Sequence, residues 1–253
     1  MGLSSEQLHR AEDAFESRQR LRRLRAMTRG ELAQALRGEP TEVAKWVQSA
    51  AEHGVGAAQL RWGAMLLEGF GVAPDAGLAL HWFLRAARAG DSEAMNMAGR
   101  CFENGWGSEP DLAQAARWYR RSADCGHDWG EYNYANLLFD GRGVALDRKL
   151  ALLYYRRAAD RGHGRAMNLL GRCYEAGWGC EKNPGLAALW YERSAATGYF
   201  RGQFNHGCML LEEGRIAEAA GWLKQAALQG DDSLRRHVRQ RLASAGLPPF
   251  NVI

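Results

Sequence analysis

Five glycines follow one another at a constant interval of 36 residues, at Gly54, Gly90, Gly126, Gly162 and Gly198. Eight residues before each of them stands an aromatic residue: Trp46, Trp82, Trp118, Tyr154 and Trp190. Trp222 and Gly230 close the series at a shorter interval of 32 residues. Self-similarity at a period of about 20–50 residues indicates a repeat array, in which each unit packs mainly on its neighbours.

One period reads as a helical hairpin. Within residues 91–126, two apolar runs place their members three and four positions apart, which puts them on one face of a helix. Gly105 and Gly126 end these runs, where a helix favours a residue with positive φ. Asp111 opens the second run as a helix N-cap, and the same place is held by Asp75, Asp147 and Asn183. Every period therefore predicts two capped helices, and the chain an all-α fold.

Small residues recur at two fixed phases of the period. The ninth residue after each boundary glycine is Gly63, Gly99, Ala135, Gly171 or Gly207. Three residues before each aromatic stands Ala79, Ala115, Ala151, Ala187 or Ala219. A glycine inside a helix costs up to about 1 kcal/mol relative to alanine. Its recurrence predicts two helices that cross too closely for a side chain.

These residues together resemble the Sel1-like repeat, a relative of the tetratricopeptide repeat. In one copy the pattern is Ala94, Gly99, Phe102, Gly105, Gly107, Asp111, Ala115, Trp118, Ser122, Ala123 and Gly126. The resemblance implies an all-α, right-handed superhelix, a solenoid of stacked helical hairpins that serves as an adaptor or scaffold. The array takes residues 41–230, with a half-repeat before repeats one to five, at 55–90, 91–126, 127–162, 163–198 and 199–230. Repeat five departs from the pattern, because its loop at Glu213 is shortened.

Both ends are expected to cover the array with polar helices. Residues 1–40 predict an N-terminal helical cap, with one helix from about Ser5 and a second that begins with a capping box of Thr28 and Glu31. Residues 231–253 predict a capping helix and then an extended tail, because two consecutive prolines, Pro248 and Pro249, forbid a helix there.

Composition favours a reduced, cytoplasmic and bacterial protein. The 253 residues carry a mild net charge of +4 and five cysteines, none of them in a CxxC pair. The first thirty residues contain no apolar signal region, and no run is long enough to span a membrane. Of the 33 basic residues only four are lysines, a bias typical of GC-rich genomes.

Catalytic motifs are not found. The sequence has no Walker A, HExxH or GxSxG motif, and its G-x-G pairs lie between helices without the preceding strand that a nucleotide loop needs. His53, His127 and His163 stand in inter-repeat turns, with no cysteine or carboxylate at a metal-ligand spacing. We therefore expect a protein that is not an enzyme, with no cofactor, no metal and no evident small-molecule substrate.

Polar residues on the first helices are the main candidate binding site. First helices line the concave face of such solenoids. Repeats two and four place Asn96 with Arg100 and Asn168 with Arg172 one turn apart, opposite the buried side, and repeat three has Tyr132 and Asn136 there. All these side chains donate hydrogen bonds, so they predict a groove for an extended peptide or a protein edge. A merely hydrated polar groove is the alternative.

Two further features bear on binding. Trp106 and Trp178 stand in Gly-Trp-Gly loops, either tucked between repeats or exposed as interface anchors. Five arginines between Arg18 and Arg25, with four more between Arg235 and Arg241, make the terminal helices basic. They form a solvated helix face or, as the alternative function, a site for nucleic acid or another anionic surface. The sequence leaves the partner and the oligomeric state open.

Overall fold

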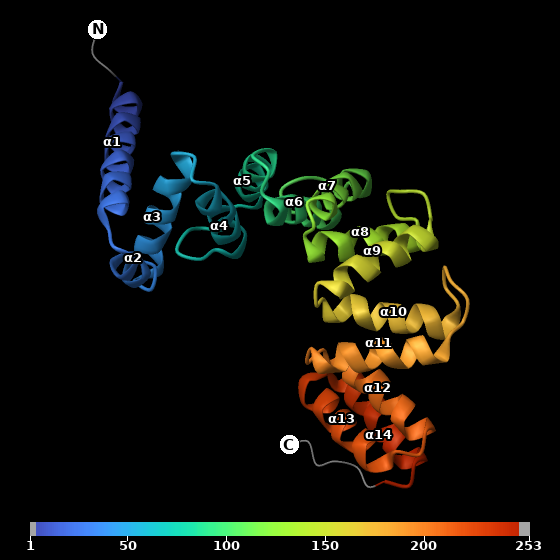
Figure 1. Ribbon diagram of the computed structural model, residues 1–253. Helices are drawn as coiled ribbons and strands as arrows, with labels where there is room; N and C mark the ends of the chain where they lie inside the picture. The colour runs from blue at the N-terminus through green and yellow to red at the C-terminus, as the bar shows by residue number, and fades with distance from the viewer. Residues whose placement is uncertain (1–3, 248–253) are drawn as a thin grey trace. The chain divides into compact units, whose positions relative to one another are not determined.

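A computed structural model describes residues 4–247, which form fourteen α-helices and no strand (Figure 1). The expected all-α class is therefore confirmed. The helices are α1 Ser5–Ala26, α2 Arg29–Ala35, α3 Pro40–Glu52, α4 Gly56–Glu68, α5 Ala76–Arg88, α6 Ser92–Asn104, α7 Leu112–Asp124, α8 Asp128–Asp140, α9 Arg148–Asp160, α10 Gly164–Ala176, α11 Pro184–Ala196, α12 Phe200–Glu212, α13 Ile216–Gln229 and α14 Asp232–Ser244. Residues 248–253, where the extended tail is expected, lie outside the described residues.

The helix ends follow from local chemistry. The carboxylate of Asp75 accepts a hydrogen bond from the backbone N–H of Leu78 at 2.8 Å, which satisfies one of the unpaired donors of the first turn of α5. The same N-cap bond is made by Asp111, Asp147 and Asn183. The first helices α4, α6, α8 and α10 each end at a glycine in the left-handed region, with φ of 70–78°. The predicted caps are confirmed.

The chain divides into two compact halves, residues 1–118 and 119–253, hereafter the N-terminal half and the C-terminal half. In the N-terminal half α3 packs on α4, α4 on α5 and α5 on α6. Their core holds Trp62, Met65 and Phe83, which are at most 4% exposed. Apolar burial of this kind is the main stabilising term for stacked hairpins.

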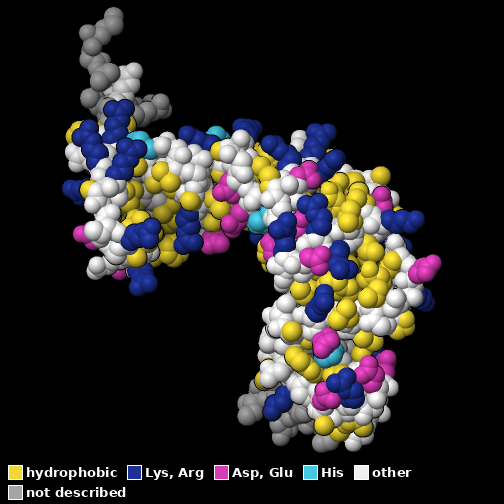
Figure 2. Space-filling model, in the orientation of Figure 1, with side chains coloured by type: hydrophobic (Ala, Val, Ile, Leu, Met, Phe, Trp, Pro, Cys, Tyr) yellow, Lys and Arg dark blue, Asp and Glu magenta, His cyan; other side chains and the backbone are white. Residues whose placement is uncertain are grey.

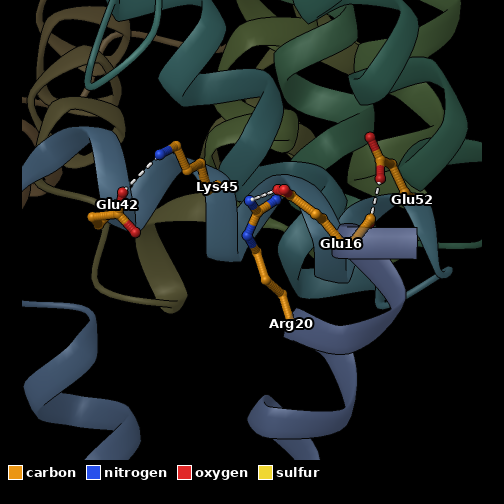
Figure 3. Close-up of polar contacts among 6 residues, drawn as sticks. Glu16, Arg20, Glu42, Lys45 and Glu52 are labelled. Atoms are coloured by element: carbon orange, nitrogen blue, oxygen red, sulfur yellow. Dashed lines mark hydrogen bonds and ion pairs between the residues drawn. The ribbon is translucent and has the colours of Figure 1, made fainter. Parts of the chain in front are cut away.

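Polar contacts attach α1 to α3 (Figure 3). The hydroxyl of Ser17, a buried residue, donates to Oε2 of Glu52 at 2.7 Å, and the amide of Gln48 donates to the other carboxylate oxygen at 2.9 Å. The exposed pairs Arg20–Glu16 and Lys45–Glu42 lie beside this contact but add little to stability in water. The next helix, α2, has the predicted Thr28–Glu31 capping box and no buried residue.

In the C-terminal half the hairpins pack in chain order, α8 on α9, α9 on α10, and so on to α14. The first helices α10 and α12 also contact each other directly. The core holds Tyr155, Trp190, Tyr191 and Leu223, all at most 2% exposed. Helix α14 packs on α13, with Val238 and Leu242 buried.

The recurrent glycines mark close helix crossings, as predicted. A Cβ on Gly171 would lie 2.5 Å from the ring of Tyr191, and one on Gly63 would lie 2.7 Å from the ring of Phe83. Real Cβ atoms are essentially never found that close. Each ring belongs to the residue directly after the aromatic that defines the period, so the first helix of a repeat rests on the second helix through that ring.

We predict that Gly171→Leu lowers the free energy of unfolding by about 1–3 kcal/mol or more, because the new side chain displaces the Tyr191 ring. The matched control is Gly221→Leu, since Gly221 lies inside α13 with no atom within 4 Å of its Cβ position. There a better helix former should stabilise slightly. Urea denaturation of both variants measures the difference, and equal stabilities would show that α10 and α11 do not cross as described.

A buried carboxylate replaces an amide in repeat three. In repeat one, Gln59 donates its side-chain amide to the carbonyl of Ala51 at 3.2 Å. Glu131, the equivalent residue, is fully buried and has no such donor. Arg157 supplies the missing donor, because its guanidinium donates to the carbonyl of Ala123 at 3.0 Å. The same guanidinium pairs with Glu131 at 2.9 Å, and Arg161 lies 3.4 Å from the second carboxylate oxygen of Glu131. Burial raises the pKa of Glu131 in spite of the two arginines.

We predict that Glu131→Gln is tolerated or stabilising, whereas Arg157→Ala destabilises by about 1–3 kcal/mol, because it leaves a buried carboxylate with one partner fewer. The folded-state pKa of Glu131 is raised, so the stability it contributes is present below the ordinary glutamate pKa and is lost as the pH rises through the folded value. The advantage of Glu131→Gln over the wild type should therefore be larger at about pH 7 than at about pH 4. Denaturant titrations at both values test this, and a stability difference that does not change with pH contradicts it.

Candidate functional site

The first helices of the C-terminal half form a polar depression. A cavity of about 330 Å³ lies among α10, α12 and the start of α14. Two of the predicted site residues, Asn168 and Arg172, line it. The other described lining residues are Phe200, Arg201, Phe204, Asn205, Asp231, Ser233, Leu234 and His237. We call this depression, together with the exposed face of α8 and α10 that bears Trp129 and Arg165, the first-helix face.

The two predicted asparagines are not surface groups, which corrects the expectation that they point away from the buried side. Asn96 and Asn168 are each only 5% exposed. Asn168 accepts a hydrogen bond from the side-chain amide of Asn205 at 2.8 Å, across the contact between α10 and α12. This phase of the first helix faces the next first helix, so its amide is used in packing between repeats. It is therefore not free to bind the backbone of a peptide.

Tyr132 and Asn136 of α8 are half-buried and have partners within the C-terminal half. The Tyr132 ring stacks on His163 at 4.7 Å, and Asn136 accepts a hydrogen bond from the Tyr155 hydroxyl at 2.7 Å. His163 caps α10, since its Nδ1 accepts from the backbone N–H of Ala166, which assigns the proton of the neutral ring to Nε2. Burial, the largest contribution, lowers the pKa of His163, so the ring stays neutral at physiological pH.

The predicted arginines lie on the predicted tryptophans. Arg100 places its guanidinium 5.2 Å from the Trp106 ring, and Arg172 repeats the contact with Trp178 at 5.3 Å. Both arginines are exposed and both tryptophans are half-buried. Trp106 packs against the core of the N-terminal half, and Trp178 contacts Phe139 of repeat three with ring centroids 5.5 Å apart. The loop tryptophans are thus tucked in, and each serves as a platform for an exposed cation.

Some residues of the first-helix face were missed from the sequence. Arg165 and Arg201 occupy the third position of repeats four and five, where repeat three has Trp129. Both arginines are exposed, and the guanidinium of Arg165 lies 5.3 Å from the Trp129 ring. The sequence could have indicated them, because the third, sixth, seventh and tenth positions after a boundary glycine lie on one side of the first helix. The arginines predicted from the sequence, Arg100 and Arg172, both occupy the tenth position.

The charge of this face is positive. Arg165, Arg172 and Arg201 are exposed on it, while the described residues that line the cavity include one carboxylate, Asp231. That carboxylate accepts the backbone N–H of Leu234 at 2.8 Å as the N-cap of α14. It is therefore partly neutralised by the helix N-terminus. The arrangement can bind carboxylates or other anions beside the aromatic side chains of α12.

The remaining predicted residues belong to the N-terminal half. Asn96 and Arg100 are part of α6, and Trp106 stands in the loop after it. Each repeats the chemistry of its counterpart 72 residues later, at Asn168, Arg172 and Trp178. The three cysteines Cys101, Cys173 and Cys208 are buried, and burial raises the pKa of the first two thiols to about 12, so they are unreactive at neutral pH.

Tandem hairpins of 36 residues, closed by left-handed glycines and packed through a glycine–aromatic crossing, define an α-solenoid of the tetratricopeptide type. The Sel1 repeat family model matches residues 56–91, 92–127, 130–163, 164–199 and 201–231. The chain therefore belongs to the Sel1 repeat family. Sel1 repeat proteins generally mediate protein–protein interactions and are generally non-catalytic scaffolds.

Solved structures agree with this assignment. A Sel1 repeat protein from Oxalobacter formigenes is 27% identical, with a TM-score of 0.71 over 83% of this chain and 90% of its own. A protective antigen of uropathogenic Escherichia coli strains that displays an SLR fold is 30% identical, with a TM-score of 0.70 over 81% of this chain. This chain spans less than half of that antigen, 45%. A putative Sel1 repeat protein from Klebsiella pneumoniae, 21% identical with a TM-score of 0.51, covers 78% of this chain and 98% of its own and shares the fold.

A comparison with curated proteins gives no match. Among the described residues, no helix combines the length and the apolar character needed to cross a membrane.

Proposed function

We propose that this chain is a non-enzymatic adaptor that binds an acidic, extended segment of a partner protein on the first-helix face of its C-terminal half. The observation that carries the proposal is the cavity of about 330 Å³ in which Arg172 and Arg201 stand beside Phe200 and Phe204. Guanidinium groups bind carboxylates in a bidentate geometry, and the aromatic rings supply rigid apolar contact area. Protein interaction is also the general role of the Sel1 repeat family.

The structure changes which side chains take part in this proposal. Because Asn168 is buried and bonded to Asn205, contacts to a peptide backbone are assigned to Ser233 and to the carbonyl oxygen of the half-buried Asn205 side chain, and not to a ladder of asparagines. Tyr132 and Asn136 are assigned a positioning role and no direct contact with the peptide, since Tyr132 stacks on His163 and Asn136 binds the Tyr155 hydroxyl. Arg172 keeps its predicted role, now oriented by the Trp178 ring beneath it. In the N-terminal half, Arg100 on Trp106 is proposed as an equivalent anchor.

The competing proposal is binding of nucleic acid or another anionic surface by the terminal arginine helices. Arg18, Arg22 and Arg23 of α1 are exposed, as are Arg236, Arg239 and Arg241 of α14. Binding to a polyanion weakens steeply with salt because counterions are released, whereas an acidic peptide held by two arginines should show a shallow dependence. The salt dependence therefore separates the two functions.

We predict that Arg172→Ala combined with Arg201→Ala weakens partner binding by about a hundredfold, because each charge-assisted bond contributes about 1.5 kcal/mol or more. Affinity capture and mass spectrometry would identify the partner, and calorimetry with that purified partner gives the dissociation constants. Thermal unfolding of the double variant should match the wild type, since both arginines are exposed.

The control is Arg22→Ala with Arg23→Ala on α1, which should leave this affinity unchanged. If the control variant loses affinity and the Arg172/Arg201 variant does not, the binding site is the basic terminus. If neither variant changes the affinity, the first-helix face is not the site.

A further inference from the structure

The N-terminal half contains a second, apolar cavity that the proposed function does not use. It measures about 490 Å³ and lies among α1, α2, α3 and α4. Its lining includes Leu21 and Leu24 of α1, Leu32 of α2, the C-cap residue Leu36 directly after α2, and Trp46 of α3. Figure 2 shows hydrophobic side chains gathered over α2 to α4, with basic side chains beside them. This volume falls within the range of about 300–1,000 Å³ that is typical of small-ligand pockets.

Helix α2 indicates that the cavity is built to be filled. Leu32 of α2 and its C-cap residue Leu36 line the cavity, yet no residue of α2 is buried and Leu36 is 47% exposed. Native interiors are close-packed, so a helix that covers an empty apolar space contributes little burial. A ligand between α2 and α3 would bury these leucines. Ser17 lies one turn before Leu21 on the same face of α1, and its hydrogen bond to Glu52 already fixes this helix on α3 (Figure 3).

The charge around the cavity selects the class of ligand. Apart from apolar residues, the described lining consists of Arg25 on α1 and Arg61 on α4, and it includes no aspartate or glutamate. Both arginines are exposed, so their guanidinium groups remain in contact with water at the edge of an apolar space. Such an arrangement complements a molecule with a hydrophobic body and an anionic end. Carboxylate and phosphate both pair with a guanidinium in bidentate geometry, and carboxylate is the smaller, singly charged anion of the two.

We propose that this cavity binds a linear alkyl carboxylate of the fatty-acid class. The alkyl chain lies among the leucines of α1 and α2 and against Trp46, and the carboxylate pairs with Arg25 and Arg61. Helix α2 acts as the movable cover. This site is separate from the first-helix face, and the proposal does not depend on the adaptor function.

The test is calorimetry of the full chain with saturated carboxylates from hexanoate to hexadecanoate, each below its micelle concentration. Affinity should rise about fourfold for each added methylene until the cavity is filled, which is the value for burying one such group. Dodecanol should bind more weakly than dodecanoate, and dodecyltrimethylammonium more weakly still. Hydrogen exchange of the α2 amides should slow when dodecanoate is present.

Two variants and one control locate the site. Arg25→Ala with Arg61→Ala should weaken dodecanoate binding by about tenfold or more and leave dodecanol binding unchanged. Arg22→Ala with Arg23→Ala, which removes two exposed arginines of α1 that do not line the cavity, should change neither. Ala50→Phe, which fills the cavity from α3, should shorten the longest chain that gains affinity, with an unchanged helical circular dichroism spectrum as evidence of folding.

The proposal is overturned if dodecanoate binds no more tightly than hexanoate, or if neither the Arg25/Arg61 variant nor Ala50→Phe changes its affinity. Sedimentation of the chain without ligand gives the remaining outcome. A dimer in which α2 is protected from exchange, with no binding of any alkyl carboxylate, would assign the cavity to a second copy of the chain and would refute the proposal.

Discussion

The close crossing of the two helices within a repeat is the contact on which the packing of the array depends. Gly63 and Gly171 have no side chain, so the rings of Phe83 and Tyr191 pack directly on the backbone of the first helix, at a distance where a Cβ would clash. A glycine inside a helix is locally unfavourable, so its cost is offset only by the packing it allows. Consecutive first helices also contact each other, as α10 and α12 do. Only the first-helix residues that take part in neither the crossing within a repeat nor the contact between repeats are available for binding.

That geometry decides which side chains of the first helices reach solvent. The sixth position of a repeat faces the next first helix. Asn168 therefore accepts a hydrogen bond from Asn205, and the ring of Tyr132 stacks on His163. The third position is exposed and carries Trp129, Arg165 and Arg201 in repeats three to five, and the tenth position is exposed in repeats two and four, where it carries Arg100 and Arg172. Arginine suits such positions because its guanidinium can stack on a ring and still bind an anion. The surface therefore presents oriented cations, and the amides behind them maintain the spacing between repeats.

The ends of the array face a different constraint. A repeat that lacks a neighbour must cover its apolar side with another element. At the C-terminal end α14 does so closely, with Val238 and Leu242 buried. At the N-terminal end α1 and α2 cover α3 and α4 incompletely, and a cavity of about 490 Å³ remains beneath α2. Helix α1 is held by the buried side chain of Leu21 and by the polar contact of Ser17 with Glu52, whereas no residue of α2 is buried. The cavity at the N-terminal end is apolar and lies beneath a helix without buried residues, whereas the cavity beside α14 is lined mainly by polar residues.

The sequence by itself determined the repeat, its helices and their caps, because these depend on contacts between residues close in the chain. Asp75 and Asp147 cap helices three residues away, and a glycine period of 36 residues counts hairpins directly. It also indicated the close crossing at Gly171. Only the tertiary structure decided the exposure of Asn96 and Asn168, the stacking of Arg172 on Trp178, and the cavity beneath α2. Helix periodicity gives the direction of a side chain around its own axis, but not which neighbouring helix stands there. Whether a polar residue meets water or another repeat is set by that second helix.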